Sequence, residues 1–435
     1  MSISPLIPIA AGSVLALGCL VGAFYELRCK RTIDDLPTSK TQGVFIGLAE
    51  LKGTAESETP LSGFLSGATC VQYAWQVEEH WQRTVTETSR DAQGHMQTRT
   101  RTESGWTRVA DGGEAEPFYL KDDTGVIRII PQGAKIEAKS TFNETVNPSS
   151  PLYYGKGPAS AIANSTHQRR FHETALPLHA LLYVMGPARE REDVVAPEVA
   201  RDKSAAMFLI SVRSEKQISS GYGRWSWFWM VLGLAVAVGA GVASTVIANA
   251  GSTAPIWIIG GGYLLALLLG WVWTVYNSLI GLRNRVNQAW SQVEVQLKRR
   301  HDLIPNLVHS IEGYRQYEKE TQTVLAEMRG QMEATPPGVA GQDFKGLAAV
   351  IRLTAEKYPD LKASESFLKL QQSLVDTEQR IALARDYFND IATFYNTRLS
   401  IIPDRFAAGL ARLNPRTLMS ASDFERAPVS VKLVE

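Results

Sequence analysis

Cysteine is almost missing from this 435-residue sequence, which contains only Cys19, Cys29 and Cys70. They form no C-x-x-C pair and none follows Cys70, so the sequence excludes a cysteine-built zinc site and suits a reducing compartment. An excess of charge of one sign is missing too, because 45 Lys plus Arg stand against 44 Asp plus Glu. Without a basic field, nucleic acid is not an expected partner.

Catalytic motifs are also missing: the sequence has no P-loop, nucleophile elbow, dinucleotide fingerprint or paired metal motif. Residues 123–125 spell Asp-Thr-Gly, but aspartic-protease chemistry needs a second carboxylate and the tripeptide occurs once, so we interpret it as a turn. His172-Glu173 begins like a zinc-protease helix, yet Leu176 stands where the second His is required. We therefore expect no metal, no cofactor and no enzyme activity.

Three apolar segments are long enough to cross about 30 Å of hydrocarbon: Leu6–Tyr25, Trp227–Ala250 and Ile256–Tyr276. They predict three transmembrane helices, of which the second and third form a hairpin. A lipoprotein cleavage site at Cys19 is the alternative for the first segment. However, no Lys or Arg precedes it, and the apolar run continues past Cys19.

The basic residues that flank these segments predict the orientation. They all fall on the side that carries both large polar regions: Arg28, Lys30, Arg31, Arg213, Lys216, Arg224, Arg283 and Arg285. The positive-inside rule therefore places the N-terminus outside and both large regions in the cytoplasm.

The region between the first two spans predicts β-structure. Short apolar or alternating runs at 43–51, 69–81, 117–131, 179–187 and 206–212 are typical of strands. Within 117–131 the turn residues Asp122 to Gly125 predict a hairpin. We expect a small barrel or sandwich over residues 28–225.

Helical periodicity dominates after the third span. Apolar stripes from Val286 to Leu325 and from Phe367 to Tyr395 predict two long amphipathic helices, the second with a heptad rhythm. A Pro/Gly-rich loop at 330–342 and a shorter helix at 346–357 lie between them. The predicted layout is a transmembrane helix (1–27), a β-rich domain (28–225), a transmembrane hairpin (226–276), a helical bundle (277–412) and a tail (413–435) that is either flexible or docked on a partner.

The blocks "PLSGFLSGATCVQYAWQVEE", "PFYLKDDTGVIRIIPQGA" and "RRFHETALPLHALLYVMGPARE" resemble the GIDE-type, or beside-a-membrane, domain. In mitochondrial E3 ubiquitin ligases that domain lies between two transmembrane helices. The resemblance implies a ligase-like activity, but the chemistry of those ligases belongs to a C-terminal RING finger, whose cysteine ligands this chain lacks. It therefore implies a membrane-proximal interaction domain.

The blocks "AWSQVEVQLKRRHDLIPNLVHSIEGYRQYEKET" and "YPDLKASESFLKLQQSLVDTEQRIALARDYFNDIATFYNTRL" resemble the LemA family of bacterial membrane proteins, from about Val275 to Leu410. This resemblance implies a membrane helix followed by a cytoplasmic long-helix bundle at the bacterial inner membrane. The expected fold class is thus a multidomain membrane protein with three transmembrane helices, a β-rich GIDE-type domain and an all-α LemA-type bundle.

The stretch Gln296–Tyr314 places Arg-Arg-His-Asp and a proline inside a predicted helix. Pro305 lacks an amide hydrogen, so we expect a bend or opening there. The charged residues form exposed or interhelix ion pairs, with Glu378 as one candidate partner, or they line a polar seam for a subunit or partner, or they build an active site. The candidate interface residues are Arg299, Arg300, Asp302, Pro305, Asn306, Glu378, Arg385, Asn389 and Asn396.

These observations predict a non-enzymatic inner-membrane scaffold that self-assembles through its bundle. The expected partners are further copies of the chain, membrane lipid and another membrane protein. A ubiquitin-ligase-like protein and an adaptor for a membrane protease or signalling protein are the alternatives.

Overall fold

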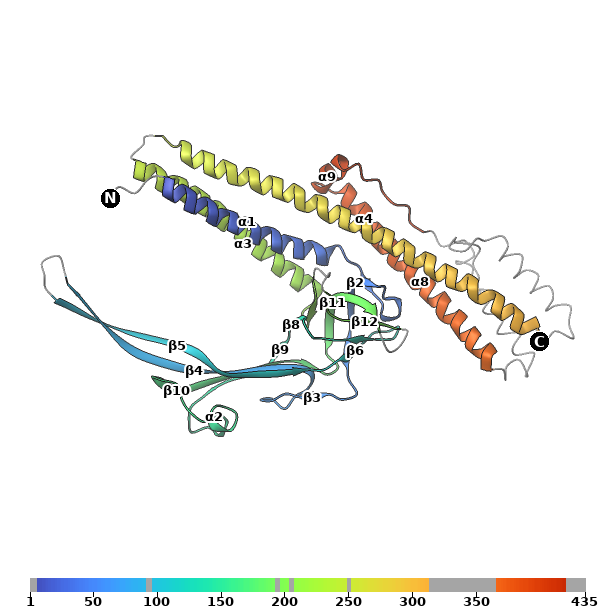
Figure 1. Cartoon of the computed structure of the whole chain (residues 1–435), viewed down its shortest axis with the longest axis horizontal. Coiled ribbons are helices and arrows are strands. Elements are labelled where there is room, and N and C mark those ends of the chain that lie inside the picture. Colours follow the sequence, from blue (N-terminus) through green and yellow to red (C-terminus); the bar gives the residue numbers. More distant parts are fainter. Residues whose placement is uncertain are drawn as a thin grey trace. The chain divides into compact units, whose positions relative to one another are not determined.

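The computed structural model of the chain describes residues 6–90, 96–191, 196–202, 207–248, 252–312 and 365–419. The chain divides into two compact units, one formed by Thr38–Glu215 and the other by Met1–Pro37 together with Lys216–Glu435 (Figure 1). The first unit is mainly β-structure and the second is helical. The chain therefore leaves the helical unit after its first helix and returns to it with its second long helix.

The β unit contains a small closed barrel, one of the two predicted types. Its strands follow one another in the order β2 (Gly47–Glu56), β6 (Phe118–Lys121), β7 (Val126–Ile129), β12 (Pro197–Val199) and β11 (Leu181–Glu190). The barrel closes because β11 pairs with β2 along eight residues. Three further strands extend the sheet: β1 (Thr38–Ser39), β13 (Leu209–Ser211) and β8 (Lys135–Glu137).

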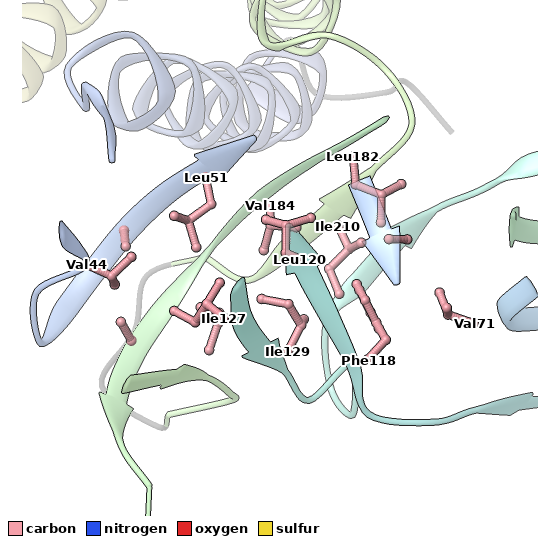
Figure 2. Packing of buried hydrophobic residues seen from close by; sticks show 14 of the residues in the cluster. Val44, Leu51, Val71, Phe118, Leu120, Ile127, Ile129, Leu182, Val184 and Ile210 are labelled. Atoms are coloured by element: carbon pink, nitrogen blue, oxygen red, sulfur yellow. The ribbon is translucent and has the colours of Figure 1, made fainter. Parts of the chain in front are cut away.

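The predicted hairpin at 117–131 is β6 and β7, and its alternation fills the barrel core. Phe118 and Leu120 on β6 and Ile127 and Ile129 on β7 are buried, while the residues between them are not. Figure 2 shows these side chains converging with others from β2, β11 and β13. Burying one such side chain contributes roughly 1.5–3 kcal/mol, so the cluster supplies the unit's main stabilisation.

A second sheet carries a long two-stranded ribbon. It consists of β3 (Leu61–Ser62), β4 (Thr69–Arg90), β10 (Ser165–Pro177) and β9 (Lys139–Val146), and β5 (Met96–Ala115) pairs with β4. The pairing of β10 with β4 ends at Ser165 opposite Trp81, so beyond Trp81 the outer part of β4 pairs with β5 alone (Figure 1). The short helix α2 (Pro151–Gly155) precedes β10. The sequence analysis was wrong to end the strand at residue 81, and it did not predict β5, β9 or β10.

The helical unit begins with the three predicted apolar helices, α1 (Leu6–Asp34), α3 (Glu215–Ala248) and α4 (Ala254–Glu312). By length and composition, all three are candidates to cross a membrane. Small and polar residues join them. Gly12 of α1 lies so close to Ala240 of α3 that an added Cβ would clash, and the Tyr263 hydroxyl of α4 donates to the Met230 carbonyl of α3 at 2.8 Å. Such contacts suit helices packed in an apolar medium.

One continuous helix, α4, contains the third apolar segment and the first helix of the bundle. The return helix α8 (Glu365–Ser400) packs along it, and α9 (Asp404–Leu410) follows. The predicted heptad stripe is buried at Leu374, Ile381, Ala384, Phe388, Ile391 and Tyr395. The helix does not end at Pro305. The predicted short helix at 346–357 and the first helix beyond residue 312 lie outside the described residues.

Candidate functional site: the polar interface of the helical unit

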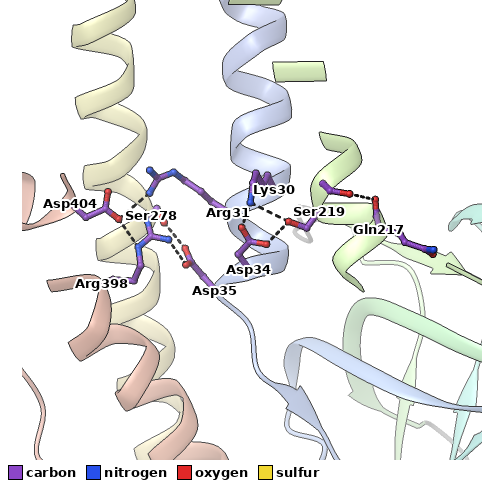
Figure 3. A network of polar contacts seen from close by, with 10 residues as sticks. Lys30, Arg31, Asp34, Asp35, Gln217, Ser219, Ser278, Arg398 and Asp404 are labelled. Carbon is purple, nitrogen blue, oxygen red and sulfur yellow. Dashed lines mark hydrogen bonds and ion pairs between the residues drawn. The ribbon is translucent and has the colours of Figure 1, made fainter. Parts of the chain in front are cut away.

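An ion cluster joins three distant parts of the chain at the end of α1. It consists of Arg31 on α1, Asp35 just after α1, Ser278 on α4, Arg398 on α8 and Asp404 on α9 (Figure 3). The side chains of Arg31 and Arg398 are each 14% exposed, and those of Asp35 and Asp404 are 7% and 4% exposed. The cluster is therefore almost entirely shielded from solvent.

Arg398 is the centre of this cluster. Its Nη1 donates to Asp35 Oδ1 at 2.7 Å, and its Nε lies 2.5 Å from Asp404 Oδ2. Arg31 Nη1 lies 3.5 Å from the same Asp404 oxygen, while the Ser278 hydroxyl donates to Asp35 Oδ2 at 2.6 Å. Two cations thus compensate two anions, as buried charges require.

Burial affects the protonation of the Asp35 carboxyl. Burial raises the pKa of Asp35 above its usual value, and Arg398 and the Ser278 hydroxyl oppose that rise only in part. Nearby, Lys30 and Asp34 on α1 form an ion pair, and Ser219 of α3 hydrogen-bonds to both of them. Polar contacts at this level therefore tie α1 to α3, α4, α8 and α9.

Arg300 is the buried member of the predicted Arg pair. It is 3% exposed, and its Nη1 lies 3.7 Å from Glu378 Oε1 on α8. The sequence analysis named this interhelix pair as one alternative, and the structure has these two side chains together. Arg300 therefore acts within the bundle as a link between α4 and α8.

Arg299 and Asp302, by contrast, are exposed. Asp302 Oδ1 lies 3.8 Å from His301 Nδ1, which is too long for the hydrogen bond of a catalytic dyad. Asn306 is exposed, and its amide donates to the carbonyl of Asp302 one turn back at 3.3 Å. The side chain of Pro305 lies outside the described residues. The structure does not bring these residues together with Arg385, Asn389 or Asn396.

Two of the three asparagines of the predicted seam, Asn389 and Asn396, hold the chain's own tail. Asn389 donates to the carbonyl of Met419 at 2.9 Å and accepts from the amide of the same residue at 2.8 Å. Asn396 makes the same pair of contacts with Arg416, at 2.7 and 2.8 Å. The Arg416 side chain donates to Asn287 of α4 at 2.8 Å. The described part of the tail is thus docked on the bundle.

The spacing of these contacts defines how the tail segment, residues 413–419, lies. Seven helical residues from Asn389 to Asn396 span about 10 Å. Three residues from Arg416 to Met419 span about the same distance only when the chain is nearly fully extended. The pairs join Asn389 to Met419 and Asn396 to Arg416, so the segment runs antiparallel to α8. Arg385, one turn before Asn389 and partly buried, makes contacts of its own.

The β unit carries its own buried ion pair, which the sequence analysis missed. Arg169 and Glu79 are fully buried with 3.1 Å between Nη2 and Oε2, and the guanidinium also donates to the carbonyls of Tyr153, Pro158 and Ser160. The N–H groups of the Arg169 guanidinium thus donate to oxygens of the same chain, which indicates a structural role. The sequence signal, an Arg-Arg pair in a β-rich segment, does not indicate which of Arg169 and Arg170 points inward.

The predicted turn is confirmed. Asp122, not Asp123, accepts from the backbone amides of Thr124 and Gly125, as the first residue of a turn does. Burial alone would raise the pKa of Asp122, but hydrogen bonds from Thr41 and Thr124 lower it to about 2. Among the residues that the structure describes, no group of three or more His, Cys, Asp or Glu is arranged to hold a metal ion.

Comparison with known proteins gives the two regions their class and family. The sequence profile of the LemA family matches residues 289–433, and that of the GIDE family, described as E3 ubiquitin ligase, matches residues 86–246. Protein LemA of Metamycoplasma hominis is 26% identical over 172 residues, which cover 38% of this chain and 78% of that protein. No solved structure matches the chain significantly. The chain is a fusion of a GIDE-type domain with a C-terminal LemA family region.

Proposed function

We propose that this protein is a non-enzymatic scaffold of the bacterial inner membrane, with its N-terminus outside and both large domains in the cytoplasm. The observation that carries the proposal is the continuity of α4, a single 59-residue helix that is both a candidate membrane span and a wall of the LemA-type bundle. Such a helix fixes the start of the bundle directly on the membrane-spanning segment.

The ion cluster supports the same role. A long helix on a span holds a bundle at one point, but Asp35 and Arg31 add a second attachment, from the end of α1 to α8 and α9. A bundle held at two points cannot rotate freely about one span. Restricted orientation favours assembly because copies in one membrane then present the same face.

We place the assembly surface on the exposed charges of α4. Arg299 and Asp302 are three residues apart on a helix, and they therefore share a face. Arg300 faces the bundle interior and is excluded as a contact residue, although the sequence analysis grouped it with them. Membrane lipid and a second membrane protein are further partners in this proposal, through the GIDE-type domain.

Mass photometry of the full-length protein in mild detergent, with an empty-micelle control, tests the proposal. We expect a discrete oligomer, and Arg299→Glu should shift the population to monomer by at least tenfold. Arg405→Glu is the matched control, because Arg405 is also an exposed arginine but lies on α9 and not on α4. A wild-type chain that stays monomeric at membrane-like density would refute the scaffold.

A ubiquitin-ligase-like activity is the alternative that the GIDE description suggests. Ligases with a RING finger need several cysteine and histidine ligands for zinc, and this sequence has no cysteine after Cys70. The discriminating measurement is zinc per purified chain. We expect well below one equivalent, whereas one or two equivalents would favour the ligase. An adaptor for a membrane protease or signalling protein is the third alternative. A monomeric protein that captures such a partner in a screen would favour it.

A further inference from the structure

Most contacts that hold the tail segment are made to its main-chain atoms and not to its side chains. Asn389 and Asn396 each contact both the N–H and the C=O of one tail residue. A carboxamide can make this pair of contacts with any residue except proline, because it carries one donor and one acceptor side by side. The Arg416 contact with Asn287 adds one side-chain determinant. The α4–α8 surface is therefore a site for an extended peptide.

The tail segment is attached weakly, because it makes few contacts with the bundle. Residues 414–418 are all exposed, including Leu418 at 51%, so the segment buries little apolar surface. Five hydrogen bonds hold it. The net gain from five such bonds is comparable to the entropy lost when six residues are ordered. The segment can therefore leave and return without unfolding the bundle.

We propose that the groove formed by Asn389, Asn396 and Asn287 binds residues 416–419 of a second copy, in exchange with its own tail. This inference rests on the proposed self-assembly and adds a second contact between copies to the one that Arg299 and Asp302 make. Each copy carries both halves of the contact, and main-chain recognition is satisfied equally by either tail. Leu413, packed against buried residues of α4 and α9, anchors the segment only at its start, so residues 414–419 are the part that exchanges.

Two full-length variants separate the halves of the contact. Asn389→Leu with Asn396→Leu removes the groove and keeps the tail. Arg416→Pro with Met419→Pro removes the two main-chain N–H donors and keeps the groove. The control is Leu418→Pro, which places a proline between the two contacts, at a residue whose amide takes no part in them. Circular dichroism checks that each variant keeps its helices, and Asn→Ala at positions 389 and 396 is the fallback if the Leu variant unfolds, because alanine also removes both the donor and the acceptor.

The variants carry different tags and are mixed in mild detergent. We expect the groove-deficient and tail-deficient chains to form a mixed complex, because one supplies the tail and the other the groove. Each variant alone should form at least tenfold less self-complex than wild type, and Leu418→Pro should behave as wild type. No mixed complex, or self-assembly of both variants at the wild-type level, would overturn the exchange. If both variants self-assemble at the wild-type level, the proposed scaffold function is retained and only the tail exchange is refuted. A monomeric wild-type chain would refute the scaffold function itself.

A labelled peptide of residues 411–419 measures the contact directly. It should bind the tail-deficient chain at least tenfold more tightly than the groove-deficient chain, a difference of about 1.4 kcal/mol. N-methylation of the Met419 amide changes only the main chain and should weaken binding about tenfold. Equal binding of the methylated peptide would overturn main-chain recognition.

Discussion

Replacing Arg398 by methionine should loosen the attachment of the bundle to α1. Arg398 contacts both Asp35 and Asp404, and its side chain is only 14% exposed. Methionine fills most of the same volume without the charge. The change removes one of the two arginines that contact these buried carboxylates; Arg31 remains in contact, and Arg285 of α4 acts on Asp35 from farther away.

The expected cost follows from what each carboxylate keeps. Breaking a buried ion pair by removing one partner typically costs about 3–5 kcal/mol. Asp404 keeps Arg31 at 3.5 Å, and Asp35 keeps the Ser278 hydroxyl at 2.6 Å. We therefore expect the lower end, about 3 kcal/mol, which corresponds to a melting temperature lower by roughly 6 °C for a helical unit of this size.

Thermal unfolding followed by circular dichroism in mild detergent measures the effect, and a double-mutant cycle tests its cause. Asp35→Asn alone should cost less, about 1–2 kcal/mol, because asparagine keeps the volume of the side chain and an oxygen that accepts from Ser278 or Arg398. The double variant restores the balance of charge, so its cost should fall below the sum by about 1–3 kcal/mol. Arg405→Met is the control, since Arg405 is exposed on α9. Additive costs, or an Arg398→Met effect as small as the control, would refute the cluster's role.

Two further predictions concern the β unit. Asp122→Asn should cost about 1–2 kcal/mol at pH 7, after allowance for partial exposure. Because the pKa of Asp122 is lowered to about 2, this contribution is present above about pH 4 and lost as the pH falls towards 2. Asp123→Asn removes only an exposed ion pair with Lys40, so it should change the free energy of unfolding by under about 1 kcal/mol at pH 7 in urea titrations. Arg169→Met should cost about 3–5 kcal/mol by leaving Glu79 buried and uncompensated, while Arg170→Met, 38% exposed, should cost under about 1 kcal/mol; equal effects would contradict the burial argument.

The spans and long helices were predictable because their signals are local. An apolar run of membrane length and a heptad stripe are each contained within one element, and α1, α3, α4 and α8 follow them. The β4–β5 ribbon has no such signal. Threonines and charges alternate along it, as in Thr84 opposite Thr102 and Arg83 opposite Glu103, so neither face reads as a core face.

For the candidate site, the sequence indicated some of the residues but not their contact partners. Asn389 and Asn396 were singled out because polar residues interrupt a helix surface, but sequence does not indicate what they contact. Their partners depend on how the chain turns after α8, which places residue 416 beside residue 396. Asp35 and Arg398 are 363 residues apart, and their pairing follows from three helices meeting at one level. The Arg300–Glu378 pair was proposed because both lie on facing helices of the same predicted bundle.

The unbroken α4 helix has a consequence for its length. Each residue of a helix turns the next by about 100°, so one residue inserted between Gly270 and Ser278 would rotate everything after it by that angle. Ser278 would then point away from Asp35, although every span and every stripe remained intact. An insertion of seven residues would restore the original direction to within about 20°, but it would move Ser278 about 10 Å along the helix axis and away from Asp35. The Ser278–Asp35 contact therefore depends on both the rotational phase and the length of this stretch of α4, and neither a single residue nor seven can be inserted here without losing it.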